Sequence, residues 1–486
     1  MPEFNRDILF LIFEELQEDS KSLFSCLMIN RLWCETVVPI LWKDPWRYNI
    51  KYANKNFLYS IITSYLSNDI KEFLTREGTQ ISNQSLTFDY LSFCKSINVN
   101  IINNIISIGT ASTFKQFLLQ QEFYNIMIRK RSELKCLNMI SLKHQIFNFP
   151  DAKAYLETLC ELKCDTSIES SYFYGLAFIC QNIQRLTIIN NVVKANYGVA
   201  KLIEVQRNLK YFEWEDDFDE DYFTEEDPYE KVLLALEKNV DNINHLKIIL
   251  SYVEDFEHIL LMKLFPKFHK LKTLIIEDFN FIIQEQLKTS VYRDLEVLEL
   301  FYISLDVVSI MIENSGGHLR EILLEYDYLF EEDNFNEDSL ILIRKIHEHC
   351  PLVERLSLAF SPSEQHFTEF EKLLKVCRKL KSLLIIPYFK EFKKNYEYGE
   401  ELLKIIIRSS STNLREIRFF EQFILTLKTL EEFFENWRGR PALTIFTSNP
   451  IYEEEDYVKL INKYKKDDGV IKDFRYKLFR DLFNFR

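Results

Sequence analysis

A short run of potential metal ligands reads His347-Glu348-His349-Cys350. Two histidines that share a metal ion on a helix are usually about four residues apart, so that both rings point to the same face. His347 and His349 are separated by a single residue, and their rings would lie on different faces. The run therefore predicts the polar end of a helix rather than a metal site.

The rest of the chain offers few residues in patterns that could carry out a reaction. Cys160 and Cys164 have the spacing of neighbours on one helix face, but no second pair of Cys or His residues completes a zinc site. Neither a Gly-rich phosphate loop nor a G-x-S-x-G elbow is present, and the 486 residues include only 9 glycines. We therefore expect a protein that is not an enzyme and needs no cofactor.

The bulk composition narrows the classes of partner and the compartment. The formal net charge of -14 and the pI near 5.3 oppose binding to phosphate backbones or anionic lipids, and no large basic patch offsets them. No apolar run approaches the ~18 residues of a membrane span. The 9 cysteines are scattered and odd in number, which is typical of reduced thiols. We expect no nucleic-acid partner, no membrane association, and a cytoplasmic or nuclear location.

One short phrase, apolar-x-x-apolar-x-apolar, recurs through most of the chain. Each copy alternates like a β-strand, and the copies are 24 to 34 residues apart, close to the period of leucine-rich repeats. Because one strand–helix unit cannot bury its apolar edge alone, the units are expected to stack around a continuous core. The middle apolar positions are Leu137, Leu162, Leu186, Phe212, Leu246, Leu274, Leu298, Ile322, Leu356, Leu383, Ile417 and Ile445.

Amphipathic segments between the copies predict the helices of this array. Cys180, Cys350 and Cys377 each stand six residues before a middle position, at a predicted helix end. The fold class we expect is an α/β repeat solenoid: a leucine-rich-repeat-like horseshoe over residues 131–450, with parallel strands on the concave side and helices on the convex side. The predicted helices include residues 229–240, 337–349, 369–376 and 400–408.

The segments on either side of the array are less regular. Residues 49–130 predict a helical junction with irregular first repeats, in which 57–66 and 112–129 are helical and 85–88 form an early strand. Residues 451–486 predict a C-terminal cap, which a solenoid needs to cover its last apolar face. An enzyme hidden in the junction is a third and weaker alternative to a binding function.

The first 48 residues predict a small module of three helices placed before the array. Asn5 is positioned to begin the first helix and Asp19 the second, while Asn30 marks the end of the second. Three helices of this length cannot bury all their apolar side chains among themselves. Either the rest of the chain or a partner must cover the surplus, and the residue pattern alone leaves both alternatives open.

Three stretches of this module resemble an F-box. Residues 7–16 are similar to its opening helix, residues 25–33 to its central signature, and Pro-Ile-Leu-Trp at 39–42 to its closing Leu-Trp; the family's opening Leu-Pro is replaced by Phe4-Asn5. With the repeats, the resemblance implies an F-box protein with irregular leucine-rich repeats. Such a protein docks on a Skp-family adaptor, which links it to a cullin scaffold. The implied adaptor contacts are Ile8, Leu9, Ile12, Phe13, Leu27, Trp33 and Trp42.

Residues that flank the buried pair of each strand point to the concave face, where a target protein would bind. In the central repeats most of them are acidic, which suggests a basic target; the alternative is a solvated strand face in an acidic protein. Two acidic insertions, within 213–230 and 330–338, predict exposed loops, since the spacing of an EF-hand calcium loop is absent. The candidate target-binding residues are Glu213, Glu215, Glu277, Glu299, Glu321, Glu325, Phe301 and Phe420.

The function expected from these features is that of a substrate-recognition adaptor in a Skp–cullin–F-box (SCF) type ubiquitin ligase. The F-box would dock on the Skp adaptor, and the concave face of the solenoid would bind a target protein. The alternative is a leucine-rich-repeat interaction scaffold that works without ubiquitin transfer, with its N-terminal helices packed as a cap on its own array. Burial of Ile12, Phe13 and Trp33 against the solenoid would favour this alternative.

Overall fold

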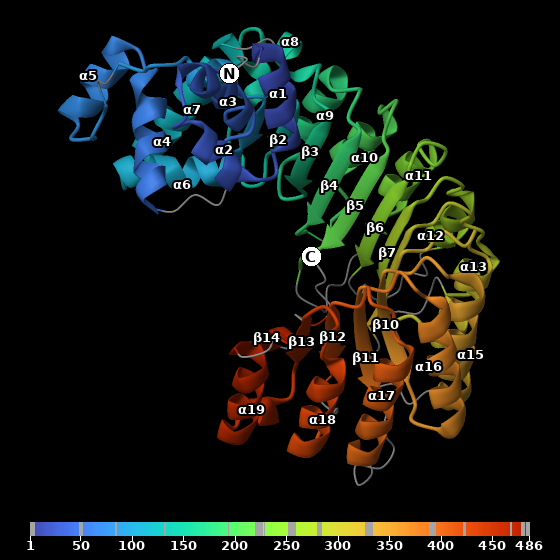
Figure 1. Cartoon of the computed structure of the whole chain (residues 1–486). Coiled ribbons are helices and arrows are strands. Elements are labelled where there is room, and N and C mark those ends of the chain that lie inside the picture. Colours follow the sequence, from blue (N-terminus) through green and yellow to red (C-terminus); the bar gives the residue numbers. More distant parts are fainter. Residues whose placement is uncertain are drawn as a thin grey trace. The chain divides into compact units, whose positions relative to one another are not determined.

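A computed structural model gives the fold as two compact units, residues 1–212 with 228–239 and residues 213–227 with 240–486. Unit 1 begins with helices, and after them helices and strands alternate in both units (Figure 1). The structure describes residues 5–47, 52–82, 85–130, 133–192, 194–218, 227, 229–250, 259–278, 284–325, 334–387, 395–420, 424–466, 469–477 and 482.

The chain begins with the three predicted helices, α1 (Arg6–Glu15), α2 (Ser20–Cys26) and α3 (Arg31–Leu41). Asn5 and Asp19 cap the first two as predicted, because their side chains accept hydrogen bonds from backbone N–H groups of the first turn. Asn30 does not end α2, which stops at Cys26; its side chain caps α3 by accepting from the Trp33 amide at 2.9 Å.

The junction contains the two predicted helices, observed as α4 (Tyr52–Ser64) and α7 (Thr113–Lys130), together with α5 (Asn68–Arg76), η1 (Tyr90–Ser92) and α6 (Val99–Gly109). The early strand expected at 85–88 is wrong, since residues 85–88 form no strand and the first strand is β1 (Ser96–Asn98). Burial explains the difference: Ile97 lies between buried Cys94 and Val99, as the middle residue of each later strand lies between buried neighbours.

Every predicted middle position lies on a strand of one open sheet, which contains fourteen parallel strands within the described residues. The strands follow one another in the sheet in the order of the sequence. Cα partners join the middle positions of successive copies, as in Leu137–Leu162, Leu274–Leu298 and Leu383–Ile417. The α/β repeat solenoid predicted from the spacing is therefore confirmed. The strands after β1 are β2 (Cys136–Asn138), β3 (Glu161–Asp165), β4 (Arg185–Asn190), β5 (Tyr211–Asp216), β6 (His245–Leu250), β7 (Thr273–Asp278), β8 (Val297–Phe301), β9 (Glu321–Glu325), β10 (Arg355–Phe360), β11 (Ser382–Pro387), β12 (Glu416–Phe419), β13 (Leu443–Thr447) and β14 (Ile471–Tyr476).

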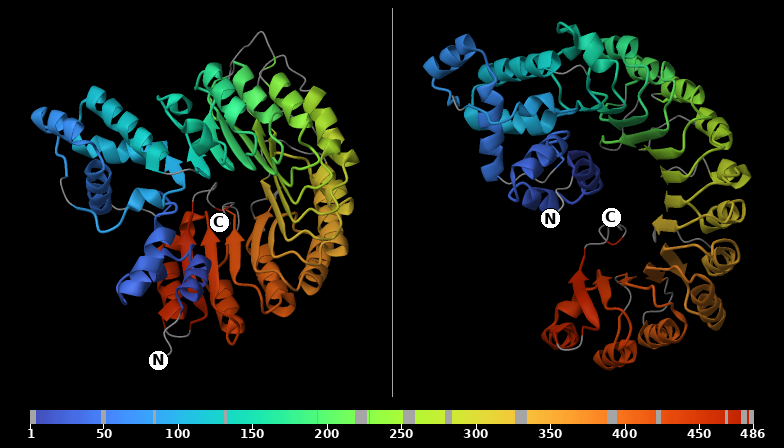
Figure 2. Two further views of the ribbon diagram at one scale, coloured as in Figure 1. Left: turned by 90° about the horizontal axis from the view of Figure 1, so that it is seen from above. Right: turned by 45° about the horizontal axis from the view of Figure 1, so that its top comes forward.

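A helix connects most neighbouring strands, and within each unit these connecting helices lie along one face of the sheet (Figures 1 and 2). We call the opposite face the open face. The four predicted helices of the array are observed as α11, α15, α16 and α17. The helices are α8 (Ala152–Leu156), α9 (Ser170–Ile179), α10 (Tyr197–Glu204), α11 (Glu230–Glu237), α12 (Ile259–Leu264), α13 (Gln284–Thr289), α14 (Leu305–Glu313), α15 (Phe335–His349), α16 (Glu364–Val376), α17 (Asn395–Ser409), α18 (Leu427–Trp437) and α19 (Glu455–Lys466), with short 3-10 turns at Ile146–Asn148, Phe265–Lys267 and Pro450–Glu453.

The last segment holds more regular structure than a simple cap. After α19 the chain forms β14, which pairs in parallel with β13 and extends the sheet by one strand. The register shifts by one residue beside Leu443 and Thr444, which indicates a bulge.

Among the described residues, no helix has the length and apolar character needed to cross a membrane.

The predicted cysteine markers occupy equivalent places between repeats. Cys180, Cys350 and Cys377 are the C-cap residues of α9, α15 and α16, and all three are buried. Burial raises the pKa of each thiol to about 12, so each stays protonated. All nine cysteines lie in described parts of the chain and are free thiols.

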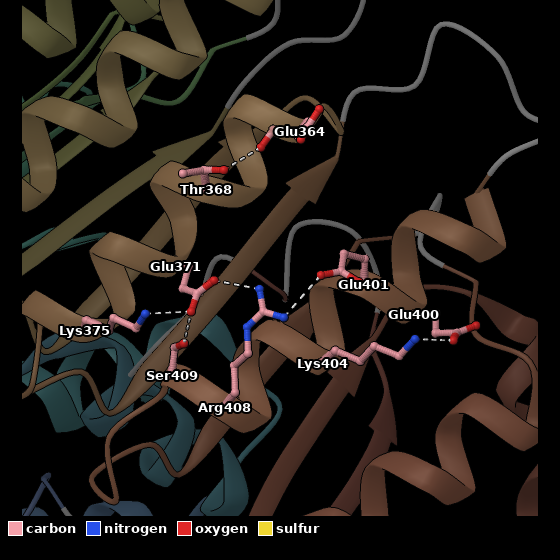
Figure 3. Close-up of polar contacts among 9 residues, drawn as sticks. All are labelled: Glu364, Thr368, Glu371, Lys375, Glu400, Glu401, Lys404, Arg408 and Ser409. Carbon is pink, nitrogen blue, oxygen red and sulfur yellow. Dashed lines mark hydrogen bonds and ion pairs between the residues drawn. The ribbon is translucent and has the colours of Figure 1, made fainter.

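Polar contacts tie neighbouring connecting helices together, and Figure 3 shows those between α16 and α17. Glu371 of α16 accepts from Arg408 of α17 at 2.6 Å and from Ser409 at 3.2 Å, and it pairs with Lys375 at 2.7 Å. The bonds to Arg408 and Lys375 hold the pKa of the Glu371 carboxyl at about 2. Glu400 contacts only its own helix in the figure, through Lys404 at 2.6 Å.

Candidate protein-interaction surfaces

The residues with metal-binding side chains do not come together. His347 Nε2 lies 3.0 Å from a carboxylate oxygen of Glu369, and within the described ranges no three His, Cys, Asp or Glu side chains form a group that could hold a metal ion. Cys160 and Cys164 do not share a helix face as the spacing suggested, because Cys160 precedes β3 and Cys164 is buried inside that strand.

The three N-terminal helices build a small core of their own. Leu9 and Phe13 of α1 pack with Leu23 of α2 and with Val37 of α3, and all are buried. The Phe13 ring meets the Trp33 ring edge to face, with 5.2 Å between the ring centroids. Phe13 is therefore buried by α2 and α3, its partners in the module, and not by the solenoid.

The opposite side of the same helices is apolar and exposed. Ile8, Leu11 and Ile12 of α1 stand at spacings of three and four residues and so share one face, on which Leu11 is 63% exposed. The turn after α2 adds Met28, which is 87% exposed. We define the apolar face of the module as Ile8, Leu11, Ile12, Phe24, Met28, Ile29 and Leu32, all of which are exposed.

The seven adaptor contacts implied by the resemblance divide between these two sides. Ile8 and Ile12 belong to the apolar face, whereas Leu9 and Phe13 point into the core and can support a contact only by holding α1 in place. The other three, Leu27, Trp33 and Trp42, are partly buried against that core. The sequence reasoning missed the exposed residues Leu11, Phe24, Met28 and Ile29, although the helical spacing of Leu11 with Ile8 could have identified it.

The module is joined to the first repeat through the segment after α3, away from its apolar face. The Trp46 indole N–H donates to the Ser96 carbonyl at 2.9 Å, and the Ser96 hydroxyl donates to Asp44 at 2.6 Å. The Lys95 amide donates to the Lys43 carbonyl at 2.8 Å. The contacts therefore leave the apolar face open to a partner.

Three of the predicted acidic target-binding residues have partners on the next strand: a histidine, a lysine and an arginine. Glu213 lies 3.1 Å from His245 Nε2, and Glu215 lies 2.9 Å from Lys247 Nζ. Glu321 of β9 lies 3.1 Å from Arg355 of β10. These pairs weaken the acidic character that the sequence suggested for the open face at both ends of the central repeats.

Glutamates on neighbouring strands of unit 2 flank an aromatic ring. Cα partners place Phe301 of β8 between Glu277 of β7 and Glu325 of β9, all on the open face and all partly exposed. Glu299 lies in the adjacent row, between Ile275 and Leu323. A partly exposed aromatic ring flanked by carboxylates suits a lysine or arginine side chain.

Phe420 does not offer an exposed anchor, which corrects the prediction for this residue. It is 5% exposed and packs with Leu384, Ile386 and Leu482. Its ring is buried because Leu482, from the segment after β14, lies on the open face of β11 and β12. No local pattern around Phe420 reports a contact with a residue so far along the chain.

Arg418 lies beside this apolar group and is only 3% exposed. Its guanidinium donates to the Glu416 carboxylate at 2.7 Å and to the backbone carbonyl of Leu482. Burial is the main influence on its pKa, which lies below the ordinary value for arginine. The two acidic insertions predicted as loops, 213–230 and 330–338, lie partly outside the described residues, at 219–226, 228 and 330–333. Their described ends correct the prediction in part, since residues 213–216 belong to β5 and residues 335–338 to α15.

Comparison with known proteins gives distant structural similarity alone. No family model matches the chain, and no curated protein matches it. A chain in the crystal structure of the yeast Rad7 and Elc1 complex is 14% identical in sequence, with a TM-score of 0.39, and the match covers 81% of this chain and 92% of that chain. At this level of similarity the match says nothing about what this chain binds.

Proposed function

We propose that the chain is a substrate-recognition adaptor of a Skp–cullin–F-box type ubiquitin ligase. Its N-terminal helices dock on a Skp-family adaptor, and the open face of its solenoid binds a target protein. The chain itself catalyses nothing; its contribution is to hold the target in position near the ubiquitin-transferring enzyme.

The observation that carries this proposal is the apolar face of the N-terminal module. A helical unit whose core is already filled by Leu9 and Phe13 still exposes a second set of large apolar side chains on α1 and after α2. Exposed apolar residues gathered on a small helical module often mark an interaction site. Helix faces with anchors three and four residues apart are a common mode of helix recognition.

The same observation opposes the cap alternative. A cap packed on its own solenoid would cover Ile12 with residues of the array, but Ile12 is exposed and Phe13 is buried within the module. A scaffold that works without ubiquitin transfer stays open as the outcome if no adaptor binds.

For the target, the geometry of the open face favours a basic segment. Glu277, Phe301 and Glu325 stand side by side across three strands, with Glu299 in the next row. A lysine or arginine of the target would stack on the ring and pair with the carboxylates, which makes binding sensitive to salt.

The adaptor contact is tested by binding of the purified full-length chain to a purified Skp-family adaptor. Ile12→Asp places a charge at the centre of the apolar face and is expected to weaken binding by at least tenfold, since a buried unpaired carboxylate is costly. Phe178→Asp is the matched control, because Phe178 is 76% exposed on α9.

The two variants distinguish the candidate functions. Weakened binding of Ile12→Asp with unchanged binding of Phe178→Asp supports adaptor docking through α1. If the unaltered chain does not bind the adaptor, or if Ile12→Asp binds as tightly as the unaltered chain, the ligase proposal fails and the scaffold alternative takes its place.

A further inference from the structure

The open face of the sheet changes character along unit 2. In β6 and β8 the residues alternate between buried on the helix side and partly exposed on the open face. In β11 all six residues are buried, although helices cover only one face of a repeat. Something therefore covers the open face of β11, and the described residues identify Leu482 as part of that cover.

The Leu482 side chain packs into a cluster of apolar side chains, and we call the surroundings of Leu482 in this cluster the pocket. Leu384 and Ile386 of β11 and Phe420 after β12 pack around the Leu482 side chain, and Phe446 of β13 packs against the same group. Cα partners place Leu384, Arg418 and Phe446 in one row across the three strands. Leu482 itself is fully buried.

A polar contact accompanies this apolar fit. Arg418 donates to the backbone carbonyl of Leu482 and also to Glu416, which accepts from the Ser382 hydroxyl at 2.6 Å. Any peptide has such a carbonyl, so the contact with Arg418 recognises the main chain of a bound segment. The apolar side chains around Leu482 select the side chain of that segment. Main-chain contacts combined with a side-chain pocket are the usual means of binding an extended peptide.

We propose that the pocket formed by Leu384, Ile386, Arg418, Phe420 and Phe446 is a binding site for an aliphatic side chain of a partner protein, and that Leu482 is its intramolecular occupant. This inference rests on the proposal that the solenoid receives a target, but it does not depend on adaptor binding. A target segment must displace Leu482, and its affinity is reduced by the high effective concentration of a tethered occupant.

A short stretch of chain connects Leu482 to the end of β14 and so keeps it near the pocket. The Lys477 amide at the end of β14 donates to the Thr447 carbonyl at 2.8 Å, and the Lys477 ammonium lies 4.3 Å from the Phe446 ring centroid. Leu482 follows five residues later. Its release leaves the strand pairing of β13 and β14 in place, because Leu482 belongs to neither strand.

The test uses the full-length chain and a fluorescein-labelled peptide with the sequence of residues 478–486. The Leu482→Asp variant empties the pocket without altering the sheet, and it is expected to bind the peptide at least tenfold more tightly than the unaltered chain by fluorescence anisotropy. A peptide carrying Asp in place of Leu482 is the matched control and is expected not to bind. A chain lacking residues 478–486 is expected to behave like Leu482→Asp.

A double variant tests whether the peptide binds in this pocket. Ile386→Asp added to Leu482→Asp is expected to abolish peptide binding while thermal unfolding stays cooperative. The proposal is overturned if the emptied chains fail to bind the peptide, or if the unaltered chain binds it equally well. Concentration-dependent self-association of the Leu482→Asp chain would assign the pocket to a second copy and would also overturn it. Skp-family adaptor binding by Leu482→Asp is measured in parallel, so that failure of the pocket and failure of the ligase proposal are distinguishable.

Discussion

Replacing Glu371 with glutamine is expected to weaken the contact between α16 and α17. The carboxylate of Glu371 binds Arg408, Lys375 and Ser409 at once. The bonds to Arg408 and Lys375 hold its pKa at about 2, compared with 4.5 for an unperturbed glutamate. Taken whole, this difference corresponds to about 3.4 kcal/mol at ~1.36 kcal/mol per pKa unit. The Glu371 side chain is 23% exposed, so solvent screens part of that energy, and we expect about 1–2 kcal/mol at pH 7.

The effect has a defined dependence on pH. Because the folded-state pKa of Glu371 is depressed, its contribution to stability is complete above about pH 4.5 and is lost as the pH falls toward 2. The difference in stability between the unaltered chain and Glu371→Gln should therefore be constant from pH 7 to 5 and should shrink across the interval from 4.5 to 2.

Hydrogen exchange measured by mass spectrometry is the suitable assay, because a repeat array opens locally and need not unfold in two states. Peptides from α16 and α17 report the opening free energy of this pair. Glu400→Gln is the matched control, since Glu400 pairs only within α17 in Figure 3 and an exposed pair of this spacing contributes about 0.3–0.5 kcal/mol. Equal effects of the two substitutions, or a Glu371→Gln effect that does not shrink at low pH, would refute the reasoning.

Three further outcomes are expected. Phe13→Ala should destabilise the N-terminal helices by about 3–5 kcal/mol and abolish adaptor binding through unfolding, seen as lost helical circular dichroism, whereas Ile12→Asp should weaken binding by at least tenfold with the dichroism unchanged. Gly316→Ala should lower the free energy of unfolding by about 3 kcal/mol, because the added Cβ would collide with the Arg293 carbonyl oxygen. The change should appear as a lower melting temperature, and an unchanged melting curve would contradict this. Glu299→Lys should weaken binding of a lysine-rich target segment and remove part of its salt dependence, as measured by calorimetry at two ionic strengths.

The repeat architecture could be predicted from sequence because each strand has to bury the same two or three positions. Leu137, Leu274 and Leu383 are fixed by that requirement, and each pairs with the next middle position in the sheet. The first strand was missed although Cys94, Ile97 and Val99 follow the same phrase, since a cysteine occupies its first position. Strand β14 was missed because the bulge beside Leu443 breaks its alternation.

The candidate surfaces were harder to predict, because a surface depends on what remains uncovered. Helix α1 carries apolar residues on two faces, and the sequence does not tell which face is buried. Leu9 and Phe13 face the core, whereas Ile8 and Ile12 are exposed. Phe420 was expected to be exposed because no pattern near it reveals that Leu482 returns to cover it. Cross-strand pairs such as Glu321–Arg355 likewise depend on register, which fixes which charges meet.

The identity of strand order and chain order has a consequence for synthesis on the ribosome. Each strand pairs only with those immediately before and after it in the sequence, so a newly made repeat finds its docking surface already complete when it leaves the exit tunnel. The nascent chain can then fold repeat by repeat, without waiting for distant segments and without long exposure of unpaired strand edges that could aggregate. The contact of Leu482 with β11 and β12 is an exception, since its carbonyl meets Arg418 across 64 residues, and it forms only after the strands that follow β12 have been made.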